Sequence, residues 1–279
     1  MRKAVIVGLG LIGGSIAQAL RGFEDFKVVG TDKSPEVCYR ALERGLIDEI
    51  GENTEDAIAS ADVVYLCMDP RGIIDMLAKL RDTFRPGALV TDVGGIKGAI
   101  MDGATVLPES VDFIGSHPMA GKETSGVENA DAAIFAGAHY IITPRENSRP
   151  QNIALLRRMA AHMKFRDVVV TTPKEHDAII AYTSQVMHIL AVSVCDDPDL
   201  FRCRGFEGGS FRGCTRVAAL DVPLWTELFS MNASALCSVI KTLEVNLRAY
   251  RETIESGDTE RLAEKLAYSA GRKKKMNLE

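Results

Sequence analysis

The sequence predicts an α/β fold, a doubly wound and mostly parallel sheet, followed by an all-helical C-terminal domain. Short β-branched runs alternate with helical patterns from residue 3 to about residue 172, and such alternation is typical of βαβ units in a parallel sheet. After Thr172 the strand pattern stops, and segments of helical periodicity continue to the end of the chain. Two domains are therefore expected.

Short apolar runs mark the predicted strands of the first part. They are KAVIVG at 3–8, KVVGTD at 27–32, VVYLCM at 63–68, LVTDV at 89–93, DFIGSH at 112–117, HYIITP at 139–144 and DVVVTT at 167–172. In an open sheet of this kind, ligands bind beyond the carboxyl ends of the strands. The residues that directly follow these runs are therefore the first candidates for a functional site.

A glycine-rich turn, GLGLIGG, follows the first predicted strand and opens a helix. In such a turn Gly8 permits the tight bend, Gly10 lets a pyrophosphate approach the backbone, and Gly13 lets helix and strand pack closely. The helix N-terminus offers free N–H groups to the phosphates. Strand, turn and helix in this order predict a Rossmann-type dinucleotide site.

An acidic residue at the end of the second predicted strand indicates which dinucleotide binds. Asp32 lies at the distance expected of the acid that accepts hydrogen bonds from the ribose hydroxyls. A carboxylate there repels a 2′-phosphate, so NAD is favoured over NADP, although Lys33 beside it weakens this preference. The predicted cofactor-binding residues are Gly8, Gly10, Leu11, Ile12, Gly13, Asp32 and Gly95.

Two loops at strand ends carry candidate substrate residues, DVGGIKG at 92–98 and GSHPMAGKE at 115–123. In the second, Pro118 keeps the preceding His117 extended. A neutral imidazole there can accept a proton or a hydrogen bond from a substrate hydroxyl. A histidine that merely satisfies the loop backbone is the alternative, and position alone does not decide between them.

The boundary between the two predicted domains falls at a helix start. Thr172 as N-cap, Pro173 at the first helical position and Glu175 three residues after the cap form a capping-box pattern. We therefore expect a dinucleotide-binding domain over 1–172 and a helical domain over 173–279.

The first helix of the second domain carries a polar stripe on an otherwise apolar surface. The stripe consists of Asp177, Ala181, Ser184, Gln185 and His188. Small and neutral polar residues suit a polar cavity better than an outer face, and this favours ligand binding. A satisfied core histidine is the alternative for His188.

Further along, GFEGGSFRGCTR places Arg212 and Arg216 after a glycine-rich stretch, and Trp225 follows. The planar fork of an arginine can hold a carboxylate through two parallel bonds, while a surface salt bridge is the simpler interpretation. An apolar seam then runs along a later helix, and it fits either a helix inside one bundle or a helix shared across a dimer. The seam consists of Leu236, Ile240, Leu243, Leu247, Tyr250 and Ile254.

Composition excludes several classes of protein. A net charge of −5 argues against a general nucleic-acid binder. The six cysteines lack the spacing of a zinc site, so we expect reduced thiols and no metal. The apolar run at the N-terminus is too short for a signal peptide or a membrane span. We expect a cytoplasmic protein that binds no membrane.

The sequence resembles the prephenate/arogenate dehydrogenases of tyrosine biosynthesis over nearly the whole chain. The resemblance rests on four motifs in order, TDVGGIKG, GSHPMAGKETSGVE, EHDAIIAYTSQVMH and FRGCTRVAALDVPLW. It implies NAD-dependent oxidation of the ring hydroxyl of prephenate with loss of carbon dioxide, giving 4-hydroxyphenylpyruvate. Arogenate would give tyrosine directly, and the sequence does not distinguish the two substrates.

The resemblance also implies roles for individual residues. His117 is similar to the catalytic histidine that bonds the ring hydroxyl, and Arg216 to the arginine that holds a substrate carboxylate. The other residues that the resemblance places at the substrate are His188, Ser184, Gln185, Glu123 and Trp225. A homodimer through the helical domain is expected.

The chain departs from the family pattern at two positions. Gly95 stands where many relatives carry a serine, so we expect a water or the backbone to support His117 instead. Gly213 stands where an acidic residue is common, which leaves the orientation of Arg216 open. Beside a prephenate dehydrogenase, a hydroxy-acid or imine reductase on the same two-domain plan remains an alternative. A non-catalytic NAD-binding regulatory module is another, suggested by the missing serine at Gly95.

Overall fold

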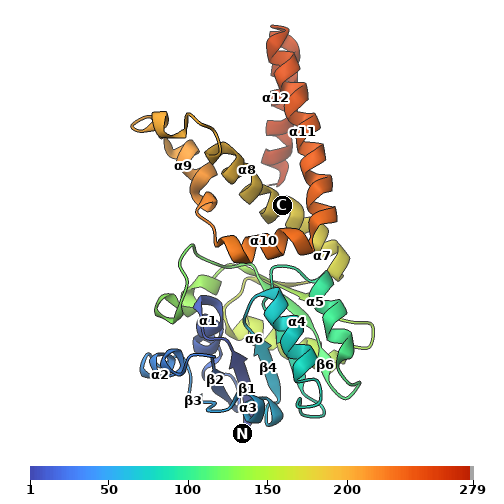
Figure 1. The fold of residues 1–279 in the computed structure, drawn as a ribbon. Helices are drawn as coiled ribbons and strands as arrows, with labels where there is room; N and C mark the ends of the chain where they lie inside the picture. The colour runs from blue at the N-terminus through green and yellow to red at the C-terminus, as the bar shows by residue number, and fades with distance from the viewer. Residues whose placement is uncertain (277–279) are drawn as a thin grey trace. The chain divides into compact units, whose positions relative to one another are not determined.

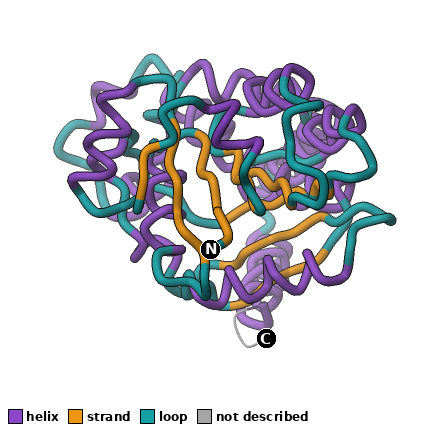
Figure 2. The backbone as a smooth tube through the Cα atoms, turned by 90° about the horizontal axis from the view of Figure 1, so that it is seen from below, coloured by secondary structure: helices purple, strands orange, loops and turns teal. Residues whose placement is uncertain are grey.

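The computed structural model describes residues 1–276, and its core is a six-stranded parallel sheet. The strands lie in the order β3-β2-β1-β4-β5-β6, the order of a Rossmann sheet. Figure 2 shows them side by side with helices on both sides. Their bounds are β1 (Arg2–Val7), β2 (Phe26–Thr31), β3 (Glu49–Ile50), β4 (Val63–Leu66), β5 (Leu89–Asp92) and β6 (Asp112–Phe113). The predicted doubly wound α/β fold is confirmed.

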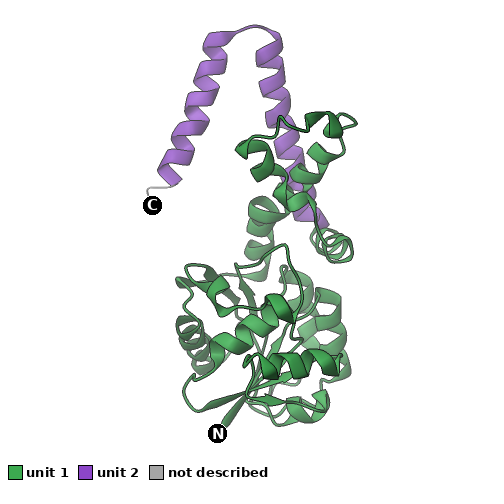
Figure 3. Cartoon of the chain, turned by 90° about the vertical axis from the view of Figure 1, so that its left-hand side faces the viewer, with its two compact units in different colours: residues 1–232 green, residues 233–279 purple. Residues whose placement is uncertain are grey.

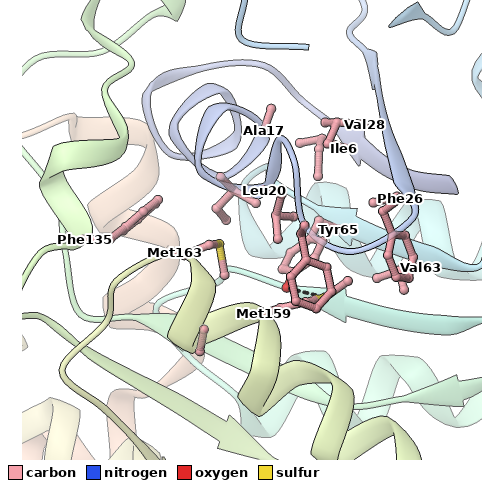
Figure 4. Close-up of a cluster of buried hydrophobic side chains, with 14 of the residues drawn as sticks. Ile6, Ala17, Leu20, Phe26, Val28, Val63, Tyr65, Phe135, Met159 and Met163 are labelled. Atoms are coloured by element: carbon pink, nitrogen blue, oxygen red, sulfur yellow. Dashed lines mark hydrogen bonds between the residues drawn. The ribbon is translucent and has the colours of Figure 1, made fainter. Parts of the chain in front are cut away.

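Helices connect these strands and cover both faces of the sheet (Figure 1). They are α1 (Leu11–Leu20), α2 (Pro35–Glu43), α3 (Thr54–Ala59), α4 (Pro70–Lys79) and α5 (Gly98–Gly103). Alternate residues of β1 enter two different cores, because successive side chains of a strand point to opposite faces. Ile6 packs with Leu20 and Tyr65 on one face (Figure 4), and Val5 packs with Ile73 on the other.

A second sheet follows, with β7 (Gly115–Pro118), β8 (His139–Thr143) and β9 (Asp167–Val170). β7 runs antiparallel to β8, and β8 runs parallel to β9. The sequence predicted one strand over 112–117, and this was wrong, because the chain changes sheets at Ile114. Ile114 N still donates to Val90 O of the first sheet, whereas Gly115 pairs with Thr143 of the second. The two-residue strand β3 was also not predicted.

After β9 the described residues form helices and no further strand, as the sequence predicts. α6 (Pro150–His162) precedes β9, and the later helices are α7 (Pro173–Ile180), α8 (Val186–Cys195), α9 (Gly209–Thr215), α10 (Val222–Met231), α11 (Ala233–Glu255) and α12 (Thr259–Met276). A π-helical turn, Ala181–Gln185, joins α7 to α8. Short 3₁₀ turns occur at Ala104–Val106, Val127–Asn129, Ala132–Phe135, Leu200–Cys203 and Arg216–Ala218.

The continuous helix Pro173–Cys195 is apolar along most of its length. Within residues 1–276 it is the one helix that is long and apolar enough to cross a membrane by length and composition. Core helices of water-soluble proteins meet the same criterion. Several large apolar side chains of this helix are exposed in the single chain, namely Ile179, Tyr182, Met187 and Val194.

The chain forms two compact units, residues 1–232 and residues 233–279 (Figure 3). The first unit extends well beyond the predicted boundary at 172/173, because α7 and α10 are tied to the sheet region. Leu228 of α10 is buried in the same core as Val90 and Ile96. Asn232 Nδ2 donates to the carbonyl oxygen of Asp177. The division of the chain into domains at 172/173 stays a prediction.

The second unit consists of α11 and α12 (Figure 3). Within it Tyr250 Oη and Ser269 Oγ lie 3.1 Å apart, and the Lys265 ammonium lies over the Tyr250 ring. The predicted seam of α11 is only partly covered, since Leu247 and Ile254 are exposed.

The core in which α1 packs against the main sheet gives a first testable prediction. Leu20 is 1% exposed and packs in this core, whereas Leu42 of α2 is 42% exposed. We expect Leu20→Ala to lower the free energy of unfolding by about 2–5 kcal/mol, through lost burial and the cavity left behind. Leu42→Ala should change it by less than about 1 kcal/mol. Urea denaturation checks both variants, and equal losses would show that this packing is not as described.

Candidate active site

A cleft with a volume of about 840 Å³ lies in the first unit, at the carboxyl ends of the main sheet. The glycine turn, the ends of β4 and β5, and the end of β7 with the loop after it contribute to its wall. α7, α8, α10 and the 3₁₀ turn Arg216–Ala218 also contribute to it. The lining residues come from 10–13, 67–70, 93–95, 117–125, 180–188 and 216–228. A volume of this size suits a small-molecule site.

Most of the predicted site residues line this one cleft, although they come from distant parts of the sequence. They are Gly10, Leu11, Ile12, Gly13, Gly95, His117, Glu123, Ser184, Gln185, His188, Arg216 and Trp225. The other two predicted residues, Gly8 and Asp32, do not line it. Gly8 packs against Cys67, and Asp32 bonds Leu9 N, so both residues support the glycine turn that lines the cleft.

The glycine turn has one open position and two closed ones. A Cβ on Gly8, whose φ is +90°, would lie 2.3 Å from Cys67 O, and a Cβ on Gly13 would lie 1.8 Å from Gly8 O. No atom lies within 4 Å of a Cβ built on Gly10. α1 begins directly after Gly10 and has no side-chain cap, so its first N–H groups remain free for an anion. The turn fits a pyrophosphate at Gly10.

Asp32 follows β2 and is held by the backbone around it. Its Oδ2 accepts a hydrogen bond from Leu9 N at 2.8 Å, and its Oδ1 accepts one from Ser34 N at 3.0 Å. These bonds fix the carboxylate against the glycine turn. Each oxygen keeps a further lone pair for a ribose hydroxyl.

His117 lies on β7 and is half-buried in the wall of the cleft. Its Nδ1 lies 3.0 Å from Nε2 of His176, and His176 Nδ1 lies 2.7 Å from Oδ1 of Asp177. Burial, and then the nearby His176 and Lys97, hold the pKa of His117 well below its usual value. His117 is therefore a neutral imidazole at neutral pH.

The contact with His176 differs from the sequence-based expectation. In place of the serine missing at Gly95, a water or the backbone was expected to support His117, and the structure instead has the side chain of His176 against its Nδ1. His176 was not predicted as a functional residue. The available signal was its position in EHD at the start of the polar helix, next to Asp177.

A buried ion pair shapes the loop that carries Gly95. Lys97 Nζ bonds Asp92 Oδ2, and both side chains are fully buried. Asp92 also accepts hydrogen bonds from Gly94 N at 2.8 Å and Ser116 N at 3.1 Å. Burial lowers the pKa of Lys97, and the charge of Asp92 opposes this shift. The pair fixes the loop 92–98 beside β7, and sequence reasoning did not single it out.

His188, which also lines the cleft, stacks on Trp225. Their ring centroids are 3.6 Å apart with an interplanar angle of 29°. His188 Nδ1 lies 3.0 Å from the carbonyl oxygen of Ser184, and burial lowers the pKa of this histidine. Nδ1 of the neutral ring therefore donates to Ser184, and Nε2 is left as an acceptor.

Gln185 is committed to the protein itself. Its Nε2 donates to Leu228 O at 3.1 Å, and its Oε1 accepts from Asn232 Nδ2 at 2.8 Å. Both ends of the amide therefore join α10 to the π-helical turn. A substrate contact by this residue stays a prediction.

Charged side chains lie at the exposed edge of the cleft. Arg216 pairs with Glu123, and the two side chains are 62% and 47% exposed. A pair this exposed contributes little to stability. Together with Lys122, Arg216 supplies the cationic side chains of the lining. No atom lies within 4 Å of a Cβ built on Gly213, so this residue leaves Arg216 unconstrained.

Two protein-family models match the chain. The model of the prephenate dehydrogenase nucleotide-binding domain matches residues 16–176, and the model of the prephenate dehydrogenase dimerization domain matches residues 172–268. The two matches together span most of the chain.

Relatives with known names or structures agree with these matches. A prephenate dehydrogenase of Bacillus subtilis is 30% identical over 92% of this chain and 71% of its own length. The structure of prephenate dehydrogenase from A. aeolicus in complex with hydroxyphenyl propionate and NAD⁺ superposes with a TM-score of 0.87 at 30% identity, covering 100% of this chain and 99% of that one. That of Synechocystis arogenate dehydrogenase gives 0.84 at 29% identity, covering 99% and 100%. The chain belongs to the prephenate dehydrogenase family.

Proposed function

We propose that the protein is an NAD-dependent prephenate dehydrogenase, which converts prephenate to 4-hydroxyphenylpyruvate in tyrosine biosynthesis. The observation that carries this proposal is a neutral His117 in the same cleft as an uncapped helix N-terminus and an open Gly10. A base and a dinucleotide cradle in one cavity are what an alcohol oxidation needs. The A. aeolicus relative supports it, since its structure holds NAD⁺ and a hydroxyphenyl acid.

The residues around the glycine turn would hold NAD, which accepts a hydride when bound. The backbone at 10–13 meets the pyrophosphate, and Asp32 meets the ribose hydroxyls and repels a 2′-phosphate. Gly95 lines the same cleft as the glycine turn and His117. Its missing side chain leaves room there, since a Cβ would meet only Leu228, at 3.4 Å and beyond.

His117 takes the role of the base. A neutral imidazole accepts the proton of the ring hydroxyl while a hydride leaves the carbon that carries this hydroxyl. General base catalysis by a positioned side chain contributes about 10²- to 10⁴-fold in rate. Loss of carbon dioxide follows without a dedicated group, because the product ring becomes aromatic.

Arg216 takes the role of the carboxylate binder. Its guanidinium is exposed and pairs with another carboxylate, that of Glu123, so a substrate carboxylate can replace Glu123 as its partner. Ser184, His188 and Trp225 line the same cleft. The stacked rings of His188 and Trp225 offer a flat surface to the substrate ring.

The predicted helical domain, which begins at residue 173, would also bring two copies of the chain together. The family model over 172–268 describes a dimerization domain. The exposed apolar side chains of Pro173–Cys195 and of α11 supply a surface that needs covering. We propose that a second copy covers it in a cytoplasmic homodimer.

An arogenate dehydrogenase is the second candidate, because the Synechocystis relative is an arogenate dehydrogenase. Steady-state production of NADH from each substrate decides between them. We expect turnover with prephenate and NAD, and a higher kcat/KM for prephenate than for arogenate. Turnover of arogenate alone would favour the second candidate. Turnover of neither would overturn both and leave a reductase or a regulatory module.

The open position in the glycine turn gives a test of cofactor binding. Gly10→Val places a side chain where the pyrophosphate would lie, and its Cβ has no protein atom within 4 Å. We expect the Kd for NAD to rise at least about 10-fold, by loss of the phosphate contacts, with little change in Tm. Gly271→Ala, also with no atom within 4 Å, is the control. Unchanged NAD affinity in Gly10→Val would place the cofactor elsewhere.

The role of His117 gives a second test. We expect His117→Asn to lower kcat about 10²- to 10⁴-fold while NAD still binds. The wild-type rate should fall as His117 gains a proton. Burial holds the pKa of His117 well below 6.5. We therefore expect kcat to be constant near pH 6.5 and to decline only at a pH well below that value. A pH profile with its midpoint at or above 6.5, lost in His117→Asn, would contradict this.

A further inference from the structure

We propose that His176 is a positioning residue, which Asp177 orients and which fixes the proton of His117 on Nδ1, leaving the lone pair of Nε2 for the substrate hydroxyl. The catalytic part of this inference rests on the proposed function. The tautomer itself does not, because it follows from three side chains in sequence. Asp177, His176 and His117 form a chain of hydrogen bonds of 2.7 and 3.0 Å that ends at the cleft.

The chain begins with an ionised carboxylate. Burial opposes the ionisation of Asp177, but hydrogen bonds from His176 and from the amides of Gly98 and Lys97 outweigh it and hold its pKa below the usual value. The two amide bonds measure 2.8 and 2.7 Å. An ionised carboxylate only accepts hydrogen bonds, so the ring nitrogen that faces it must carry a proton. That nitrogen is Nδ1 of His176.

The same logic passes to the next ring. Burial lowers the pKa of His176 more than its bond to Asp177 raises it, so the ring is neutral at neutral pH and holds a single proton, on Nδ1. Its Nε2 is then an acceptor. His117 Nδ1 lies 3.0 Å from that atom, and two lone pairs at this distance would repel. His117 must therefore donate from Nδ1.

The free nitrogen of His117 is the one that the reaction needs. With its only proton on Nδ1, the neutral ring presents the lone pair of Nε2. Within residues 1–276, Nε2 of His117 makes no hydrogen bond. It is also absent from the buried polar atoms that lack a partner, so it is not buried. Because His117 lines the cleft, Nε2 opens into it. The opposite tautomer would present an N–H there and could not accept the hydroxyl proton.

His176 acts through His117 and not on a ligand. It is 1% exposed and does not line the cleft. The ammonium of Lys97, whose charge acts on His176, is paired with Asp92. His176 therefore supports His117 in a chain that has Gly95 where many relatives carry a serine. A buried histidine that only packs is the alternative, and it predicts no control over the tautomer.

Two variants of His176 separate positioning from packing. His176→Phe keeps a flat ring but removes the acceptor that faces His117, whereas His176→Gln keeps an acceptor on a side chain of similar length. We expect His176→Phe to lower kcat about 10- to 10³-fold, less than the loss in His117→Asn, with the KM for prephenate and the Kd for NAD changed less than about 3-fold. His176→Gln should recover kcat to within a few-fold of the wild type.

The tautomer is read directly by ¹⁵N NMR of the histidine-labelled full chain without substrate. We expect a protonated Nδ1 for His117 in the wild type and in His176→Gln, and a protonated Nε2 or a mixture in His176→Phe. His139→Phe is the control, since it removes a half-exposed histidine–aspartate pair that joins β8 to β9 outside the cleft, and it should change nothing.

Two results would overturn the inference. One is a wild-type His117 with its proton on Nε2, and the other is an equal loss of kcat in the Phe and Gln variants with the tautomer unchanged. If His176→Phe does not fold, the wild-type tautomer and His176→Gln still decide. Because the NMR measurement needs no substrate, its outcome is independent of whether the protein oxidises prephenate.

Discussion

The carboxylate of Asp177 is the constraint on which the candidate site depends. A buried carboxylate is costly unless hydrogen bonds satisfy it. Here it accepts bonds from the amides of Lys97 and Gly98 and from His176. The first two attach α7 to the loop that follows β5, and the third orders the histidines. One group therefore joins the helical region to the sheet and sets the state of the proposed base.

The buried ion pair of Asp92 and Lys97 fixes the same loop, residues 92–98. Asp92 also bonds the backbone of Ser116, and this becomes possible because the chain leaves the first sheet at Ile114. That change of sheet aims His117 at the cleft and not into the core. Burial, with the cationic Lys97 beside them as a smaller cause, holds the pKa of His117 and of His176 below the usual value, so both imidazoles are neutral at neutral pH. Fold and chemistry share these few contacts.

Local pattern made much of this structure predictable. The parallel strands, the glycine turn and the helices after Thr172 follow from periodicity and from residue types that act on their own neighbours. The residues that the family resemblance suggested, such as His117, Arg216 and Trp225, do line one cleft. Their individual roles remain proposals.

The features that sequence reasoning missed depend on contacts between distant residues. Nothing local indicates that His176 meets His117, or that the run at 112–117 divides between two sheets. The bonds from both ends of the Gln185 amide to Leu228 and Asn232, far along the chain, were not foreseen either, and its assignment to the substrate stays a prediction. The compact units divide after Asn232 for the same reason, because α7 and α10 contact the sheet region.

A crystal structure of the protein with NAD and the product 4-hydroxyphenylpyruvate tests the central claim most directly. The claim is that His117 meets the reacting hydroxyl with Nε2 while His176 holds Nδ1. The account predicts Nε2 of His117 within about 2.6–3.2 Å of the phenolic oxygen, with the contact to His176 retained. A phenol bound by another side chain, or a His117 ring turned away from His176, would contradict it.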